Sequence, residues 1–285
     1  MQLFSSQDFD VLTILQDNET FLLMTGYWKT HTEPVLVKIY RNIHVAERDI
    51  LIAEWARRQQ LVHPVLAQIL EYGHTKAGEP YCIYEHPTGT SLAELPPRQV
   101  QELGFFMPLL ADILEGLGYL HAHDMQHGAI TSHAIRILEN TGRPQLTDYG
   151  VSIYGQRETA ELVQTAPAMG LPPEMIRRII PDGRADLYAL GATLYEVLTG
   201  RPVFDGEPLD ILRSHLYKDV TALQQFLPRF PDALARFVHT LLEKDRALRF
   251  HTAEEALRFL AEYSLLPARS SNDKMQVRVA LRVAR

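Results

Sequence analysis

The spacing of apolar residues changes part-way along this chain, and that change limits the folds open to it. Up to about residue 86, short apolar runs rich in β-branched and aromatic residues lie between polar turns, as at 9–15, 20–28 and 34–40. These runs predict β-strands. From residue 100 onward the apolar residues recur at helical spacing, which predicts amphipathic helices. The sequence therefore predicts an α+β fold built from two unlike parts.

The remaining elements set the order of these parts. A helix is expected over 46–61, ending before His63-Pro64 because proline disfavours helix in the residue before it. Two more strands are expected between 66 and 86, then a long helix over 100–124 and a hairpin over 135–150 with its turn at Asn140-Thr141-Gly142. The chain is mostly helical after residue 173. We expect a bilobal fold with a small β-rich lobe over residues 1–86, a helical large lobe over 87–265, and a tail over 266–285.

The tail has a pattern of its own. Between residues 277 and 283 valine or leucine occupies every second position, and arginine occupies two of the positions between them. This is the period-two pattern of a strand with a basic face. The sequence leaves open whether the tail begins a further domain, pairs with the sheet of a partner, or is disordered.

Composition excludes several classes of function. The formal net charge of -7 over 285 residues offers no general attraction to nucleic acid or to an anionic membrane. The single cysteine, Cys82, lies in an apolar run and suits a reducing compartment. The first residues lack the basic and apolar segments of a signal peptide. The most apolar helix candidate, near 185–200, is short for a bilayer and carries Asp186 and Glu196. We therefore expect a cytoplasmic protein without a membrane span.

A series of short motifs follows in a fixed order. Lys38 ends the strand-like run "VLVK", and Glu54 lies nine residues before His63. The connector "YCIYEHPTGT", the segments "TDYG" and "LPPE", the helix "RADLYALGATLYEVLTG" and the segment "EKDRALRF" come later. This order and spacing resemble a protein kinase domain over roughly residues 9–265, and are most similar to bacterial-type Ser/Thr protein kinases.

The resemblance implies a role for each matched residue. Lys38 paired with Glu54 would direct an ammonium toward phosphates, and Asp148 would bind Mg²⁺. The Lys38–Glu54 pair could equally be only a tie between the lobes. Tyr84 matches the gatekeeper of the nucleotide pocket. The resemblance implies a bidentate ion pair between Glu174 and Arg249. Structural roles are implied for both of these residues and for His127 and Asp186.

The segment that would cover the phosphates departs from the family. Kinases of this type have a glycine-rich loop there, because glycine lets the backbone approach phosphate oxygens. In this chain Gln16, Asn18 and Phe21 stand at the three glycine positions. The Phe21 ring is expected to enter the space that phosphates would need.

The catalytic loop departs further. Of the family's His-Arg-Asp-Leu-Lys-Pro-Glu-Asn, the segment "HGAITSHA" keeps His127. The base aspartate is replaced by Ala129, the lysine by Thr131 and the second metal ligand by Ala134. Alanine can neither accept a proton nor bind Mg²⁺. The resemblance therefore implies the loss of most groups that stabilise phosphoryl transfer.

The adenine pocket is altered as well. Leu36 stands where the family has a small residue, and Arg136 stands where it has an aliphatic floor residue. These side chains are expected to fill or charge a slot for a flat apolar ring. Arg58, four residues after Glu54, replaces an apolar residue that packs on the aromatic residue of the metal-binding motif.

These departures lead to the expectation of a pseudokinase, a domain with the kinase fold that is not an enzyme. We expect no cofactor, with binding of ATP and Mg²⁺ as the open alternative at Lys38, Glu54 and Asp148. The expected role is that of a signalling regulator or scaffold. Its expected partner is a protein, such as another kinase or signalling domain.

Three alternatives stay open at this point. An unorthodox kinase could recruit a base such as Asp124, Glu158 or His133, since part of the site remains. A nucleotide-binding switch without transfer is the second. A metal site built from the histidines between 121 and 133 is the third, but packing and backbone bonding explain histidines there at least as well.

Overall fold

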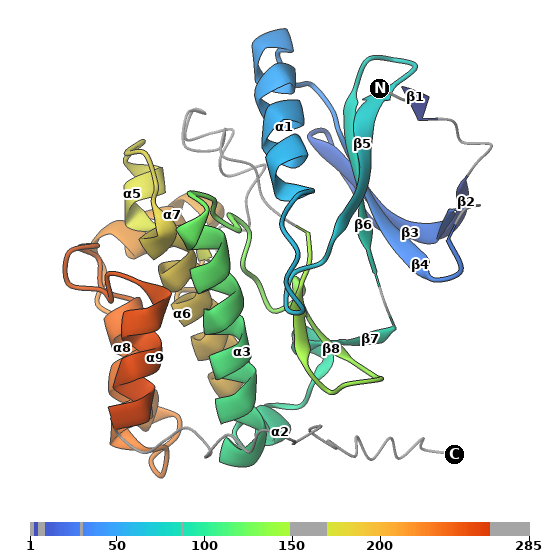
Figure 1. Ribbon diagram of the computed structural model, residues 1–285. Coiled ribbons are helices and arrows are strands. Elements are labelled where there is room, and N and C mark those ends of the chain that lie inside the picture. Colours follow the sequence, from blue (N-terminus) through green and yellow to red (C-terminus); the bar gives the residue numbers. More distant parts are fainter. Residues whose placement is uncertain (1–2, 5–8, 29–30, 87, 149–169, 263–285) are drawn as a thin grey trace.

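The computed structural model describes residues 3–4, 9–28, 31–86, 88–148 and 170–262. Six described strands form one sheet in the small lobe (Figure 1), in the order β1-β5-β6-β4-β3-β2. Their bounds are Leu3–Phe4 (β1), Phe9–Asp17 (β2), Phe21–Trp28 (β3), Pro34–Tyr40 (β4), Ile69–Thr75 (β5) and Pro80–Glu85 (β6). The three strands predicted between 9 and 40 are confirmed as β2, β3 and β4. The sequence pattern does not predict β1.

The first two strands lie at opposite edges of this sheet. β1 pairs with β5 at one edge and β2 pairs with β3 at the other, yet only residues 5–8 separate β1 from β2 in the sequence. The chain from Phe4 to Phe9 can span at most about 18 Å, whereas six flat strands would extend over about 24 Å. The sheet is therefore curled. One of its faces carries a small apolar cluster formed by Phe9, Met24, Val35, Val37, Ile39, Tyr81 and Ile83.

Helix α1 (Val45–Arg58) packs on the other face of the sheet. Its first turn is closed by a capping box between His44 and Glu47. Leu51 and Trp55 are fully buried and belong to the main apolar core, together with Tyr84 of β6. The helix ends a few residues before the predicted stop at His63-Pro64. This placement carries Glu54 and Arg58 to the junction of the two lobes.

A smaller sheet begins the large lobe. Its strands are β7 (Gly89–Ser91), β8 (Ile135–Leu138) and β9 (Pro144–Leu146), in that order, and the predicted hairpin is the β8–β9 pair. Gly142 in its turn has a φ of 67°, which glycine adopts without strain. The amide of Leu146 donates to the carbonyl of Val65, and this bond joins the hairpin to the segment before β5.

The large lobe is mostly helical, as predicted. Its described helices are α2 (Pro97–Val100), α3 (Leu103–Ala122), α5 (Pro173–Ile176), α6 (Gly183–Thr199), α7 (Pro208–Tyr217), α8 (Asp232–Leu241) and α9 (Ala253–Glu262), with short 3₁₀ turns at Leu92–Glu94 and Leu223–Gln225. Helix α6 begins at an Asp182 cap and ends at Gly200, whose φ is 70°. The residues of α6 are buried on every face of the helix, so α6 forms the centre of this lobe.

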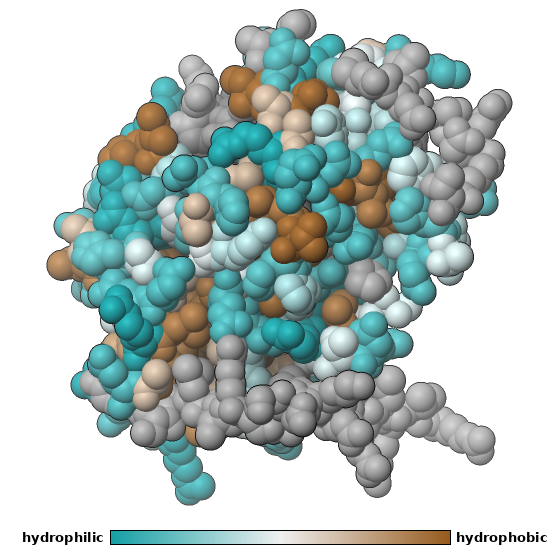
Figure 2. Space-filling view, in the orientation of Figure 1, coloured by the Kyte–Doolittle hydropathy of each residue, from teal (hydrophilic) through white to brown (hydrophobic). Residues whose placement is uncertain are grey.

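Among the described helices, α3 is the one long and apolar enough to cross a membrane by length and composition. The helix expected near 185–200 is therefore not the most span-like one. Of the apolar window in α3, 72% is buried inside the protein, as in the core helix of a folded domain. On the face seen in Figure 2, apolar residues form separate small groups among polar ones. The tail at 266–285 lies outside the described residues, and the expected lobe boundaries stay predictions.

Candidate active site

Lys38 lies on β4, enclosed between the two lobes. Its Nζ donates to Oδ1 of Asp148 at 2.7 Å, although 110 residues separate the two in sequence. The ammonium also lies 4.5 Å from the centroid of the Phe21 ring and 5.4 Å from that of Tyr40. Lys38 is only 3% exposed. A carboxylate and two aromatic faces thus hold the positive charge where phosphates are expected to bind.

The turn between β2 and β3 stands in place of the glycine-rich loop. Oδ1 of Asn18 accepts hydrogen bonds from the amides of Thr20 and Phe21, both at 2.9 Å, and from the Thr20 hydroxyl at 2.7 Å. Arg41 adds bonds from Nη1 to the Asn18 carbonyl and to Asp17. This is a closed Asx turn rather than an open loop. It fixes Phe21 over Lys38, as the sequence predicts for the ring, and leaves Gln16 exposed on β2.

Arg58 connects α1 to the catalytic loop. Its Nε and Nη2 donate to Oε1 of Glu54 at 3.1 and 2.5 Å, and Nη2 also donates to the carbonyl of Gln126 at 2.5 Å. The guanidinium is buried, with 4% of its side chain exposed. Where the family has an apolar contact, this chain has a charged and hydrogen-bonded one. The pairing of Lys38 with Glu54 stays a prediction, because the contacts described here are Lys38–Asp148 and Glu54–Arg58.

The carboxylate of Asp186 holds the backbone of the catalytic loop through hydrogen bonds. Asp186 of α6 accepts from the amides of His127 and Gly128, both at 2.8 Å, and contacts Nε2 of His121 at 2.9 Å. Burial opposes ionisation, but the hydrogen bond and charge of His121 hold the pKa of Asp186 below its usual value. Burial lowers the pKa of His127 to about 4, so this histidine is neutral at pH 7. Asp186 therefore has the structural role that the resemblance implies.

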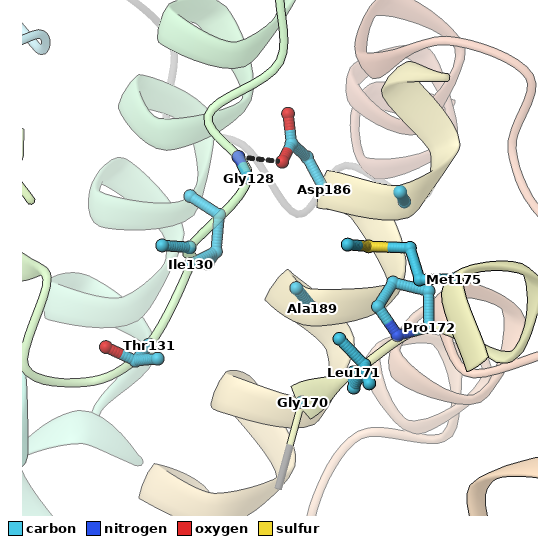
Figure 3. A pocket seen from close by; sticks show the side chains of 11 residues that line it. Gly128, Ile130, Thr131, Gly170, Leu171, Pro172, Met175, Asp186 and Ala189 are labelled. Atoms are coloured by element: carbon cyan, nitrogen blue, oxygen red, sulfur yellow. Dashed lines mark hydrogen bonds between the residues drawn. The ribbon is translucent and has the colours of Figure 1, made fainter. Parts of the chain in front are cut away.

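A small cavity lies beside the altered loop. Figure 3 shows it between the loop residues Gly128, Ile130 and Thr131 and the facing Met175 and Ala189. Its volume is about 40 Å³, and its lining is mostly apolar. The full lining is Gly128, Ala129, Ile130, Thr131, Gly170, Leu171, Pro172, Met175, Ala185, Asp186 and Ala189. Ala129 borders this space, which is large enough for a small side chain.

The backbone of the loop keeps its shape without the family's polar side chains. Thr131 accepts from the amide of Ala134 through its hydroxyl at 3.2 Å and through its carbonyl at 3.1 Å. The carbonyl of Ala134 in turn accepts from the amide of Thr147, the residue before Asp148. These bonds hold Asp148 against the loop, with a φ of 53°.

The family model described as the protein kinase domain matches residues 24–259. This chain belongs to the protein kinase family. The match covers the small lobe from β3 onward and nearly all of the described large lobe. The fold class and the resemblance stated from the motifs are confirmed.

Named relatives of this kinase domain are bacterial. It is 30% identical over 220 residues to the DNA damage-responsive serine/threonine-protein kinase RqkA of Deinococcus radiodurans. The aligned region covers 74% of this chain and 33% of that relative. It is 30% identical over 213 residues to the probable serine/threonine-protein kinase PknB of Corynebacterium glutamicum, covering 69% and 32%. The chain spans about a third of the length of these curated relatives. A crystal structure of Rad53 1-466 in complex with AMP-PNP is 20% identical, with a TM-score of 0.69, covering 88% of this chain and 64% of the other.

These comparisons overturn one expectation. We expected a domain that is not an enzyme, but the relatives of this kinase domain are named Ser/Thr protein kinases, which points toward an enzyme. The physical reason for the error is one of magnitude. A general base contributes roughly 10²- to 10⁴-fold to a rate. Loss of the base therefore slows a reaction by that factor, but the missing side chain alone does not show that the remaining catalysis is zero.

The residues predicted to alter the nucleotide pocket lie on β4, β6 and β8. Leu36 and Tyr84 are partners across β4 and β6, and both are buried. Burial raises the pKa of Tyr84 well above its usual value. Arg136 on β8 reaches across to β7, where its Nη2 donates to the carbonyl of Gly89 at 2.5 Å. Burial together with the charge of Arg136 lowers the pKa of His86, next to the connector, to about 4.

The structural ion pair of the family is present. Nη1 and Nη2 of Arg249 donate to Oε1 and Oε2 of Glu174, both at 2.8 Å. Both side chains are buried, with 0% and 4% exposed. The pair joins α5 to the segment between α8 and α9. The bidentate geometry predicted for these two residues is confirmed.

Several site features were not predicted. The closed turn at Asn18, the contact from Arg58 to Gln126 and the cavity beside Ala129 depend on three-dimensional proximity. A signal for the first was present, since asparagine favours Asx turns. Residues Tyr149 and Gly150 of the metal motif and residues 151–169, which include Glu158, lie outside the described residues. The described residues hold no group of three His, Cys, Asp or Glu placed to bind a metal ion.

Proposed function

We propose that this domain is an ATP-dependent Ser/Thr protein kinase of an unorthodox kind, which transfers the γ-phosphoryl group slowly and without a base in its catalytic loop. The observation that carries the proposal is the contact between Lys38 and Asp148 in a member of the kinase family. Lys38 is the group that would bind phosphates, and Asp148 is the group that would bind Mg²⁺.

The chemistry of phosphoryl transfer supports this proposal. The transition state is loose, and catalysis depends on positioning and charge more than on covalent chemistry by the protein. The absence of a base at position 129 is therefore expected to slow transfer by a factor on the order of 10² to 10⁴. Thr131 and Ala134 add further losses, because neither supplies a charge or a metal ligand.

Binding of a nucleotide requires Lys38 and Asp148 to exchange their mutual contact for contacts with phosphate and Mg²⁺. Lys38 is enclosed by Phe21 and Asp148, so phosphates reach it only when the Phe21 ring moves aside. Mg²⁺ would replace the ammonium beside Asp148, whose side chain is 25% exposed and open to a metal. The Asx turn at Asn18 opposes this movement. Weak nucleotide affinity is the expected result.

The acceptor proposed is a small hydroxyl. The named relatives are serine/threonine-protein kinases, which supports a seryl or threonyl acceptor. Protein substrates and a cytoplasmic location, where ATP and Mg²⁺ are supplied, belong to this proposal. The lone buried cysteine agrees with such a compartment.

Two measurements test the proposal together. Incorporation of labelled phosphate from ATP, with Mg²⁺ or Mn²⁺, reports transfer, and the shift in melting temperature with ATP reports binding. Lys38→Met is expected to abolish both signals. Lys76→Met, which changes an exposed lysine in the turn between β5 and β6, is expected to leave both unchanged. Absence of transfer and of binding in the unaltered chain, under all metal conditions, would refute the proposal.

A nucleotide-binding switch is the second candidate, and the enclosure of Lys38 favours it. Because ATP must displace Phe21 and separate Lys38 from Asp148, binding alone would change the arrangement of the lobes. ATP-dependent protection of α1 in hydrogen exchange, without measurable transfer, would support this function over the first.

A further inference from the structure

Among the described residues, strand β2 forms one edge of the small-lobe sheet. It pairs with β3 on one side, and it is the last strand in the sheet order of the described residues. An edge strand presents unpaired amides and carbonyls, which proteins usually protect with lysine, proline or bulges. β2 contains neither lysine nor proline between Phe9 and Asp17. Of these protections it has only bulges, at two register shifts toward β3 near Leu12 and Leu15.

This edge is also apolar. Val11, Leu12, Ile14 and Leu15 are 53, 54, 56 and 52% exposed, so four aliphatic side chains in a run of five residues face solvent. Scattered apolar residues are normal on a surface, but an apolar group on a sheet edge is typical of an interaction site.

The sequence of β2 is nearly symmetric about Thr13. In an antiparallel pair of two β2 strands centred on Thr13, Leu12 of one copy faces Ile14 of the other, and Val11 faces Leu15. Each apolar side chain then meets another one across the pair, as strands require for stability. Near the ends of the pair Asp10 faces Gln16, so no charges of the same sign meet.

Electrostatics favours this register over one of its two adjacent registers. A shift of one residue, centred between Thr13 and Ile14, would place Asp10 opposite Asp17, and like charges directly opposite are destabilising.

We propose that β2 pairs antiparallel with β2 of a second copy of this chain, with Thr13 on the twofold axis. The two small-lobe sheets then form one continuous sheet, and the eight exposed aliphatic side chains cover one another. Such an interface is isologous. It lies at the small end of the range for specific interfaces, so the dimer is weak and depends on concentration.

A register-specific disulfide tests the proposal directly. Thr13→Cys places two thiols opposite each other on the axis, within the 4.4–6.8 Å Cα separation of disulfides. We expect a covalent dimer under mild oxidation. Gln16→Cys, also exposed on β2 but several residues from the axis, is the matched control and is expected to stay monomeric. The natural Cys82 is buried and gives no background. Equal cross-linking of the two variants, or none in either, would overturn the register and the interface.

Sedimentation over a range of concentrations gives the second test. We expect wild-type chains to associate as concentration rises, and Ile14→Lys to weaken association at least tenfold. Val62→Lys changes a residue that is 74% exposed in the connection after α1 and is the control expected to behave as wild type. A wild-type chain that stays monomeric at every concentration, or two lysine variants of equal effect, would contradict the proposal. Neither test depends on kinase activity.

Discussion

Lys38 and Asp148 form an ion pair that is buried at one end only, because the lysine side chain is 4% exposed and the aspartate 25%. The loss in unfolding free energy therefore depends on which of the two partners is replaced. Asp148→Asn leaves a buried ammonium beside a neutral amide, and is expected to lower the free energy of unfolding by about 2 kcal/mol. Lys38→Met places an apolar chain between the Phe21 and Tyr40 rings, and is expected to cost less. Urea denaturation of both variants measures the difference, and a larger loss for Lys38→Met would contradict it.

Ala129→Asp is expected to increase phosphoryl transfer. The cavity beside position 129 has room for the added carboxylate, and a base there contributes roughly 10²- to 10⁴-fold. Initial rates of labelled phosphate incorporation measure the increase. Ala129→Asn, of the same size without basicity, is expected to give no gain.

Arg249→Met is expected to destabilise the large lobe strongly. It leaves the Glu174 carboxylate buried without its bidentate partner, at a cost of about 3–5 kcal/mol. Arg213→Met is the comparison, because Arg213 pairs with Asp210 on the surface at 3.5 Å, where both side chains are mostly exposed. Surface pairs contribute roughly 0–1 kcal/mol. Similar midpoints of unfolding for the two variants would refute the structural role of Glu174–Arg249.

Stability is expected to fall with acidification between pH 6.5 and 4. His127 has a pKa of about 4 in the folded chain, because it is buried, and an ordinary value of 6.5 when unfolded. In this window the unfolded chain binds the proton and the folded chain does not, so stability rises with pH and is lost as pH falls. His86 acts in the same direction. His127→Gln should be less stable at pH 7 yet show a shallower dependence on pH, measured by urea titrations at several pH values.

Asn18→Ala is expected to loosen the turn between β2 and β3. The asparagine oxygen accepts three hydrogen bonds there, and their removal should lower the unfolding free energy by about 1 kcal/mol. Faster proteolysis within the turn would report the local opening. Gln16→Ala, at an exposed position of β2, is the control, and an equal effect of both variants would count against the role of Asn18.

The sequence predicted the fold because its patterns are local. Strand runs, the Gly142 turn and the spacing from Lys38 to Arg249 each depend on neighbouring residues or on a fixed order. The sequence also predicted that Phe21 enters the phosphate space and that Leu36 and Arg136 fill or charge the adenine slot, and these effects on nucleotide binding stay predictions. It did not predict that Asn18 closes its turn, since the same residue suits several turns. Nor did it predict that Arg58 reaches Gln126, because that contact joins elements 68 residues apart.

The position of β1 has a consequence for the order of folding. β2 and β3 are adjacent in sequence, so their hairpin can form as soon as both are synthesised. β1 precedes them but pairs with His74 and Thr75 of β5, and it must wait until that strand has been made. Contacts between distant parts of a chain form slowly, because the intervening loop must first be closed. Although β1 comes before the other strands of the small-lobe sheet in the sequence, it is therefore expected to be among the last of them to join that sheet.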